Sequence, residues 1–142
     1  MRVSKIIIMA KPKIYKLKKF INKTGKLLPI NFNSKFPFKV KRVFFLYGKK
    51  KYSRGDHAHK KCSQFFVPVF GKCKISLKYK KISQKFILNH KQSTSLLVPP
   101  KIWCRVNFLS RKTIIMVICD YEYNFNDYIE TYKNFTKFEN KI

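Results

Sequence analysis

The stretch "RGDHAHKKCSQFFVPVFGKCKI", residues 54–75, carries the strongest structural signal in the chain. It opens with two histidines one residue apart, His57 and His59, and continues into an apolar run that is typical of a buried strand. The "FGK" after this run predicts a tight turn, because Gly71 tolerates a positive φ angle. Side chains alternate between the two faces of a strand. We therefore expect both imidazoles to point the same way, with Ala58 on the opposite face.

Short strand-like runs continue from this stretch in both directions. They are rich in β-branched and aromatic residues and are separated by turn residues, at 27–32, 40–47, 57–60, 64–70, 74–80, 82–88, 94–98, 103–108 and 112–119. Only residues 126–138 show helical spacing, with Asn126 or Asp127 as the capping residue. The pattern predicts an all-β fold, a barrel or double-sheet jelly roll, with a short C-terminal helix.

Length and composition indicate one domain over residues 1–142. The 142 residues are 45% hydrophobic and 16% aromatic, which is enough to bury a core without metals or disulfides. The sequence contains no repeat and no Gly/Ser-rich linker. Residues 1–15 form a basic N-terminal segment that we expect to be partly disordered or to pair with another subunit.

The formal net charge is +27, from 33 Lys and Arg against 6 Asp and Glu. A field of this sign attracts polyanions, including nucleic acid and anionic membranes. The lysines are spread along the whole chain, however, which favours the compositional bias of an AT-rich genome, with a small anionic substrate as the next explanation. We expect no nucleic-acid partner.

The sequence also predicts a soluble, cytoplasmic protein. The apolar stretch at 6–10 is shorter than the roughly 7–15 residues of a signal peptide core, and no run approaches the about 20 residues of a membrane span. The four cysteines show no CxxC pair, which suits a reducing compartment.

The two histidines allow three interpretations. Metal-binding β-barrel enzymes add a carboxylate and a third histidine to an H-x-H pair, whereas this chain offers Gln64 and Cys104, so a mixed His57/His59/Cys104 site stays open. Acid–base catalysis is the second interpretation, because an imidazole takes and returns protons near neutral pH. The third is structural, with both rings bonded to backbone at a strand end.

Four motifs together resemble one enzyme family. They are "KRVFFLYG" at 41–48, "RGDHAHKKCSQ" at 54–64, "VPPKIW" at 98–103 and "CDYEYNFNDYIETYKNF" at 119–135. Their order and spacing are similar to those of the sugar 3,4-ketoisomerases, metal-independent cupins that act on dTDP-4-keto-6-deoxyglucose. The resemblance covers about residues 16 to 138.

The resemblance implies a double-stranded β-helix (cupin) fold and a homodimer that exchanges N-terminal strands. It implies an isomerase that moves a keto group from C4 to C3 of the nucleotide-linked sugar through an enediol(ate), supplying a 3-keto sugar for 3-amino sugar synthesis. No metal, no cofactor and no membrane partner are expected.

The resemblance also assigns roles by position. His59 matches the base that removes the C3 proton, and His57 matches its partner, which orients the sugar or holds a hydroxyl. Arg54 and Arg42 match basic positions that face the substrate pyrophosphate.

Other candidates come from the residues themselves. Arg105 is a third basic candidate for the substrate, and Gln64 is expected to bond the sugar or a histidine. Family members commonly have two tyrosines where this chain has Phe44 and Phe45, so we nominate the next hydroxyl, Tyr47, as the proton shuttle.

Cys104 stands where the family usually has a histidine. This difference weakens any role for the position and further weakens the metal interpretation. The alternatives to the ketoisomerase are a metal-dependent cupin enzyme, and a protein that binds sugar nucleotides or polyanions without catalysis.

Overall fold

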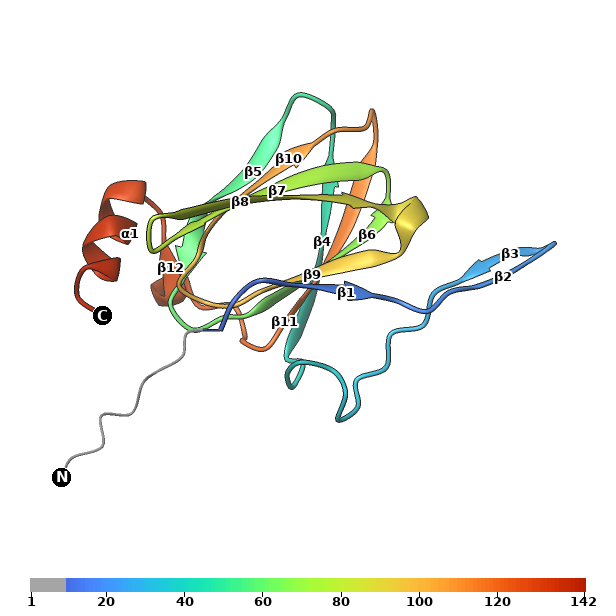
Figure 1. The fold of residues 1–142 in the computed structure, drawn as a ribbon, viewed down its shortest axis with the longest axis horizontal. Helices are drawn as coiled ribbons and strands as arrows, with labels where there is room; N and C mark the ends of the chain where they lie inside the picture. Colours follow the sequence, from blue (N-terminus) through green and yellow to red (C-terminus); the bar gives the residue numbers. More distant parts are fainter. Residues whose placement is uncertain (1–9) are drawn as a thin grey trace.

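Two five-stranded antiparallel sheets face each other in the computed structural model, which describes residues 10–142 (Figure 1). The first sheet contains, in spatial order, β1 (Lys13–Lys16), β9 (Thr94–Val98), β6 (Gln64–Phe70), β11 (Thr113–Cys119) and β4 (Arg42–Gly48). The second contains β12 (Tyr128–Ile129), β5 (Ser53–His59), β10 (Trp103–Phe108), β7 (Lys72–Tyr79) and β8 (Ile82–Asn89). One α-helix, α1 (Tyr132–Glu139), follows at the C-terminal end. The all-β double-sheet prediction with a short terminal helix is confirmed.

The space between the sheets is filled by alternating residues of the facing strands. Ile75 and Leu77 of β7 meet Ile115 and Val117 of β11 in one cluster, and all four are fully buried. Each such side chain contributes roughly 1.5–3 kcal/mol relative to an exposed position. This core keeps the two sheets in place on either side of the pocket described below.

The strand predicted at 27–32 is wrong. β2 (Phe20–Asn22) and β3 (Gly25–Leu27) form a two-stranded hairpin, and the chain is irregular from 28 to 41. Pro29 lacks a backbone donor for a ladder. Leu28 and Ile30 instead pack against the outer face of the first sheet.

The hairpin of β2 and β3 extends away from the sandwich (Figure 1). Its apolar side chains Phe20, Ile21 and Leu27 are exposed. β1, just before it, pairs with β9 of its own chain through Lys13–Lys16. Residues 1–9, which include most of the basic N-terminal segment, lie outside the described residues.

The helix predicted at 126–138 begins later than expected. α1 starts at Tyr132, and its N-cap is Thr131, whose side chain accepts a hydrogen bond from Asn134 N. Residues 125–127 form a 3₁₀ turn, and β12 then pairs with the end of β5. Tertiary pairing overrides the local helical spacing here.

A bulge in β5 sets the direction of the two histidines. Gly55 and Asp56 both have positive φ angles, of 95° and 58°, and the register with β10 shifts beside them. A Cβ atom at Gly55 would lie 2.7 Å from the carbonyl oxygen of Cys104, so only glycine fits. The Asp56 carboxylate accepts a hydrogen bond from Arg105 Nε at 2.6 Å, away from the histidines.

In the described part of the chain, no helix is long and apolar enough to cross a membrane.

Candidate active site

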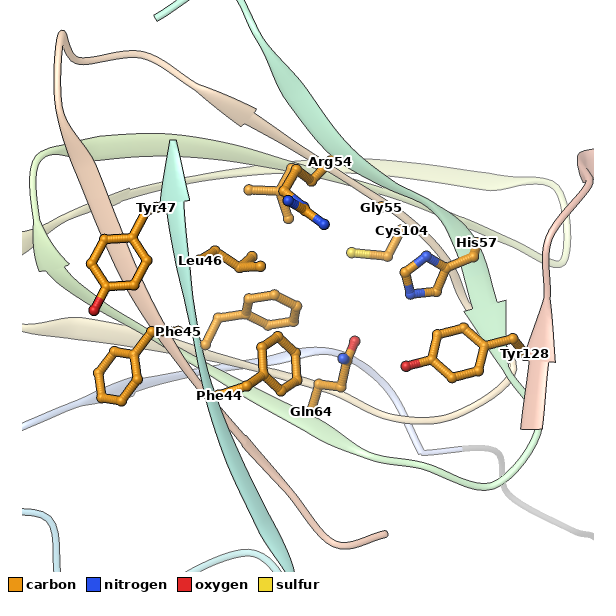
Figure 2. Close-up of a pocket in the computed structure, with 12 residues that line it drawn as sticks. Phe44, Phe45, Leu46, Tyr47, Arg54, Gly55, His57, Gln64, Cys104 and Tyr128 are labelled. Atoms are coloured by element: carbon orange, nitrogen blue, oxygen red, sulfur yellow. The ribbon is translucent and has the colours of Figure 1, made fainter. Parts of the chain in front are cut away.

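A pocket of about 520 Å³ opens between the two sheets. Figure 2 shows its walls, which come from β4 on one side and from β5, β10 and β12 on the other. Its lining is apolar along β4 and polar at the end of β5: Phe44, Phe45, Leu46, Tyr47, Arg54, Gly55, His57, Gln64, Phe66, Cys104, Val106 and Tyr128. The pocket therefore has an apolar wall on one side and titratable groups on the other.

His57 and His59 lie side by side, as their spacing predicts. Their ring centroids are 4.9 Å apart, and both rings pack against the ring of Tyr128 at 5.0 and 4.4 Å. His57 lines the pocket, whereas His59 is only 5% exposed. The pairing of β12 with β5 places Tyr128 directly opposite His59.

His59 forms a buried pair with Asp127. Its Nδ1 lies 2.8 Å from Asp127 Oδ2, and the other carboxylate oxygen accepts a hydrogen bond from Lys61 N at 2.7 Å. An ionised carboxylate can only accept a hydrogen bond, so Nδ1 must be the donor. The neutral ring therefore carries its proton on Nδ1, and Nε2 holds an unshared lone pair. Nε2 is buried, and no polar atom of the described residues bonds to it. Its lone pair is thus unshared, although protein atoms enclose it and His59 itself is not among the residues that line the pocket.

Burial keeps both imidazoles neutral. It lowers the pKa of His59 from 6.5 to about 4, although the hydrogen bond that His59 Nδ1 donates to Asp127 raises this pKa. The neighbouring His57 and Arg42 disfavour a positive charge on His59 further. Burial also lowers the pKa of His57. At neutral pH each ring is therefore able to accept a proton.

Asp127 and Tyr128 were missed as functional residues by the sequence analysis. Both lie in the quoted "NDYIETY" ending, but the helical spacing led us to interpret Asp127 as a helix cap. Burial raises the pKa of Tyr128, so its hydroxyl stays protonated at neutral pH. The C-terminal segment thereby adds one carboxylate and one hydroxyl to the histidine pair.

Two of the predicted substrate-binding residues line the same pocket. Gln64 is buried at the start of β6, and Figure 2 shows its amide facing the space between Phe44 and Tyr128. Arg54 lies on β5 before the bulge and is exposed. Among residues 10–142 no carboxylate pairs with its guanidinium, and it lies three residues before His57 along β5.

The structure does not bring Tyr47 together with the histidines. It is 70% exposed and alternates along β4 with Phe44 and Leu46, which pack toward the core. Figure 2 shows it at the opposite end of the pocket from His57.

Arg42 and Arg105 are not among the pocket-lining residues. Arg42 is half-buried behind the pocket, where its Nη2 lies 3.8 Å from Cys119 Sγ and its guanidinium lies over the rings of Phe44 and Tyr123. Arg105 is on the outer face of β10, paired with Asp56.

The residues that could hold a metal ion differ from the set that the sequence suggested. Among the described residues, His59, Cys62 and Asp127 place ligand atoms within 4.8 Å of one another. They gather on the Nδ1 side of His59, where Asp127 is already bonded to the ring and to Lys61 N. Cys104 belongs to the pocket wall, and burial raises the pKa of its thiol to about 12.

Comparison with known proteins agrees with this geometry. The family model FdtA, described as WxcM-like, C-terminal, matches residues 10–140. The TDP-4-oxo-6-deoxy-alpha-D-glucose-3,4-oxoisomerase of Aneurinibacillus thermoaerophilus is 35% identical over 131 residues, which are 92% of this chain and 94% of that protein.

Solved structures give the same result. The sugar 3,4-ketoisomerase QdtA from Thermoanaerobacterium thermosaccharolyticum, in complex with TDP, has a TM-score of 0.86 at 28% identity, covering 94% of this chain and 98% of that one. A histidine-to-asparagine variant of QdtA, in complex with TDP-4-keto-6-deoxyglucose, has a TM-score of 0.86 at 27% identity, covering 94% and 97%. The chain belongs to the FdtA family, whose relatives named here are TDP-sugar 3,4-ketoisomerases.

Proposed function

We propose that this protein converts TDP-4-keto-6-deoxyglucose into its 3-keto isomer by moving protons within the pocket. The observation that carries the proposal is the unpaired Nε2 of His59, whose Nδ1 bonds to Asp127 and whose ring packs against His57 and Tyr128 of the pocket wall. The substrate class follows from the relatives, which act on or bind this nucleotide sugar.

The first step removes the proton from C3, next to the C4 carbonyl. Nε2 of His59 takes this proton, and the C3–H electron pair forms the C3=C4 double bond while the carbonyl electrons move to O4. The product of this step is an enediolate and an imidazolium. The imidazolium then returns its proton to C4 while the proton of O3 moves to O4, which gives the 3-keto sugar and neutral His59 with no net change in composition.

Asp127 supports His59 in both states. Before the reaction its carboxylate fixes the tautomer that leaves Nε2 unprotonated, and after proton transfer it lies 2.8 Å from a cation. A negative charge at this distance favours the imidazolium in a buried site, where water screens charges weakly. The carboxylate thereby makes a base of an imidazole whose burial alone disfavours protonation.

The proton that moves between O3 and O4 needs a second donor and acceptor. Tyr128 and His57 fit this role, because both line the pocket and their rings pack against each other. The ring of Tyr128 also packs against His59. Tyr128 suits it better than Tyr47, which is exposed at the opposite end of the pocket from His57. We therefore assign the hydroxyl chemistry to Tyr128.

The charged end of the substrate lies toward Arg54 in this proposal. A guanidinium binds diphosphate oxygens through paired N–H groups, and Arg54 is the cation on the pocket wall. Gln64 then faces the sugar. Arg42 does not line the pocket, but its positive charge lowers the pKa of both His59 and Tyr128.

We further propose a homodimer that works in the cytoplasm. The hairpin of β2 and β3 extends beyond its own sandwich with Phe20, Ile21 and Leu27 exposed, and a second copy is the natural cover for such a surface. The four cysteines are all free, which suits a reducing compartment. Light scattering of the purified chain, with and without Ile21→Asp, tests the dimer.

Proton NMR in deuterated buffer tests the reaction directly. Incubation with TDP-4-keto-6-deoxyglucose should give 3-keto-sugar signals, with deuterium at C4 of the product and at C3 of the recovered substrate, and with the same rate in the presence of a chelator. Absence of exchange at C3 in the wild-type protein contradicts the proposal. A rate that collapses with chelator points instead to a metal-dependent reaction.

A further inference from the structure

A second hollow lies at the end of the sandwich away from α1. It has a volume of about 490 Å³ and is formed by the β6–β7 turn, the 3₁₀ turn η1 (His90–Gln92) and the β10–β11 turn. Four exposed cationic side chains line it, namely Lys72, Lys91, Arg111 and Lys112. None of its lining residues is shared with the pocket of His57.

The acidic residues of the chain are concentrated elsewhere. Five of the six lie between 120 and 139, in the segment that leads into and through α1, at the opposite end of the sandwich from η1 (Figure 1). The sixth, Asp56, is paired with Arg105. The cations of the hollow are therefore not balanced by carboxylates, and their mutual repulsion is relieved by a bound anion.

The N-terminal hairpin adds further positive charge beside η1. Lys19 Nζ donates to Lys91 O at 3.0 Å, and Lys26 Nζ donates to His90 O at 3.2 Å. Both ammonium groups are thereby held next to the hollow, although they come from a segment more than 60 residues away in sequence.

His90 contributes an oriented donor. Its Nδ1 lies 2.9 Å from Gly71 N and 3.3 Å from Gly71 O, and the shorter contact requires Nδ1 to accept the hydrogen. The neutral ring then carries its proton on Nε2. Stacking on Phe70, with centroids 5.1 Å apart and planes at 18°, fixes the orientation of the ring.

We infer that this hollow binds a compact ligand with two or more phosphate groups. Its volume is that of a small-molecule site, and four of its nine lining residues are cationic. A single phosphate would leave most of these cations unpaired, whereas a chain of phosphates meets several at once. Arg111 offers the paired N–H groups that bind phosphate oxygens.

Calorimetric titration with inorganic tripolyphosphate tests the inference. About one equivalent should bind, and the triple variant Lys91→Gln, Arg111→Gln, Lys112→Gln should bind at least roughly tenfold more weakly. The matched control, Lys78→Gln, Lys81→Gln, Lys85→Gln, removes the same charge around the β7–β8 turn and should change the affinity by less than about twofold. Thermal unfolding of both variants checks that the fold is intact; if the first is unstable, Lys91→Gln alone carries the comparison with a loss of about threefold.

Equal losses in the two triple variants, or no binding by the wild-type protein, overturn the inference. Thymidine triphosphate tests whether the ligand is a nucleotide or a bare phosphate chain. Its affinity is compared between the two triple variants, because both keep the pocket of His57 unchanged and any binding there cancels. A 12-residue oligothymidine that binds more tightly than both and depends on the same residues replaces the compact ligand by nucleic acid. None of these readouts depends on isomerase activity.

Discussion

The two ends of the sandwich handle charge in opposite ways. At the β12 end, one buried carboxylate, Asp127, is bonded to one buried imidazole, His59, and both are about 5% exposed. At the other end, four exposed cations surround a hollow with no carboxylate of the described residues on its lining. Removal of a single group should therefore change chemistry at the first end, whereas at the second the charges act as a sum screened by water and salt.

The largest effect is expected from His59→Asn. The variant lacks a base for the C3 proton, so kcat should fall by about 10³-fold, and deuterium exchange at C3 should fall with it. Rates measured by NMR, with circular dichroism to verify the fold, decide this. Exchange that persists at the wild-type rate assigns the base to another group, with His57 the first to test.

Asp127→Asn should come next, with a loss of about 10²-fold in kcat. An amide does not carry the charge that stabilises the imidazolium, and it can present either end to Nδ1. Asp120→Asn is the matched control, because Asp120 Oδ1 also accepts one backbone hydrogen bond, from Ser63 N at 2.7 Å, but is not bonded to a histidine. Equal losses of activity in the two variants would mean that Asp127 acts only on the fold.

Tyr128→Phe should lower kcat by roughly tenfold or more with little change in KM, since it removes a hydroxyl and retains the ring packed on both histidines. Tyr47→Phe should stay near the wild-type rate. Steady-state kinetics of the two variants separate the assignments, and the reverse ranking restores the role that the sequence suggested for Tyr47.

A smaller effect is expected from pH. His59 accepts a proton only when neutral, and burial lowers its pKa to about 4, so kcat/KM should stay level from neutral pH through 6.5 and decline only toward pH 4. The stability of the fold should also decrease as the pH falls. The unfolded chain protonates its histidine near 6.5, above the folded value, so the free energy of unfolding decreases as pH falls from about 6.5 toward 4. A pH–rate profile with a break near 6.5 contradicts the buried environment described for His59.

The smallest effect is expected from Arg105→Gln. The pair with Asp56 is about half exposed and is screened by water, so its loss should leave the free energy of unfolding almost unchanged and kcat/KM within about twofold. Arg54→Gln is the comparison, because it should raise KM through the diphosphate. Urea unfolding and steady-state kinetics give both numbers, and a large rise in KM for Arg105→Gln alone would place the diphosphate on the outer face of β10.

Local signals account for most of the fold. Alternation and turn residues predict β6, β7 and β9 to within a few residues, and the turn at Gly71 is confirmed by its φ angle of 79°. The turn between β7 and β8 also forms, with Lys80 and Lys81 at positive φ although neither is glycine. Two predictions are wrong, namely the strand at 27–32 and the start of the helix at 126 instead of Tyr132. In both segments, packing and strand pairing with distant residues override the local propensity.

The features of the site likewise fall into those that local sequence predicts and those that depend on the fold. The one-residue spacing of His57 and His59 predicts that they share a face, because period-two alternation is a property of any strand. The bond between Nδ1 of His59 and Asp127, 68 residues away, follows from the fold and not from any local pattern. That contact depends on β12 pairing with β5, and a hydrogen bond between strands leaves no periodic mark in the residues between them. The fold likewise places Tyr47 at the end of the pocket away from His57 and gathers four exposed cations around one hollow.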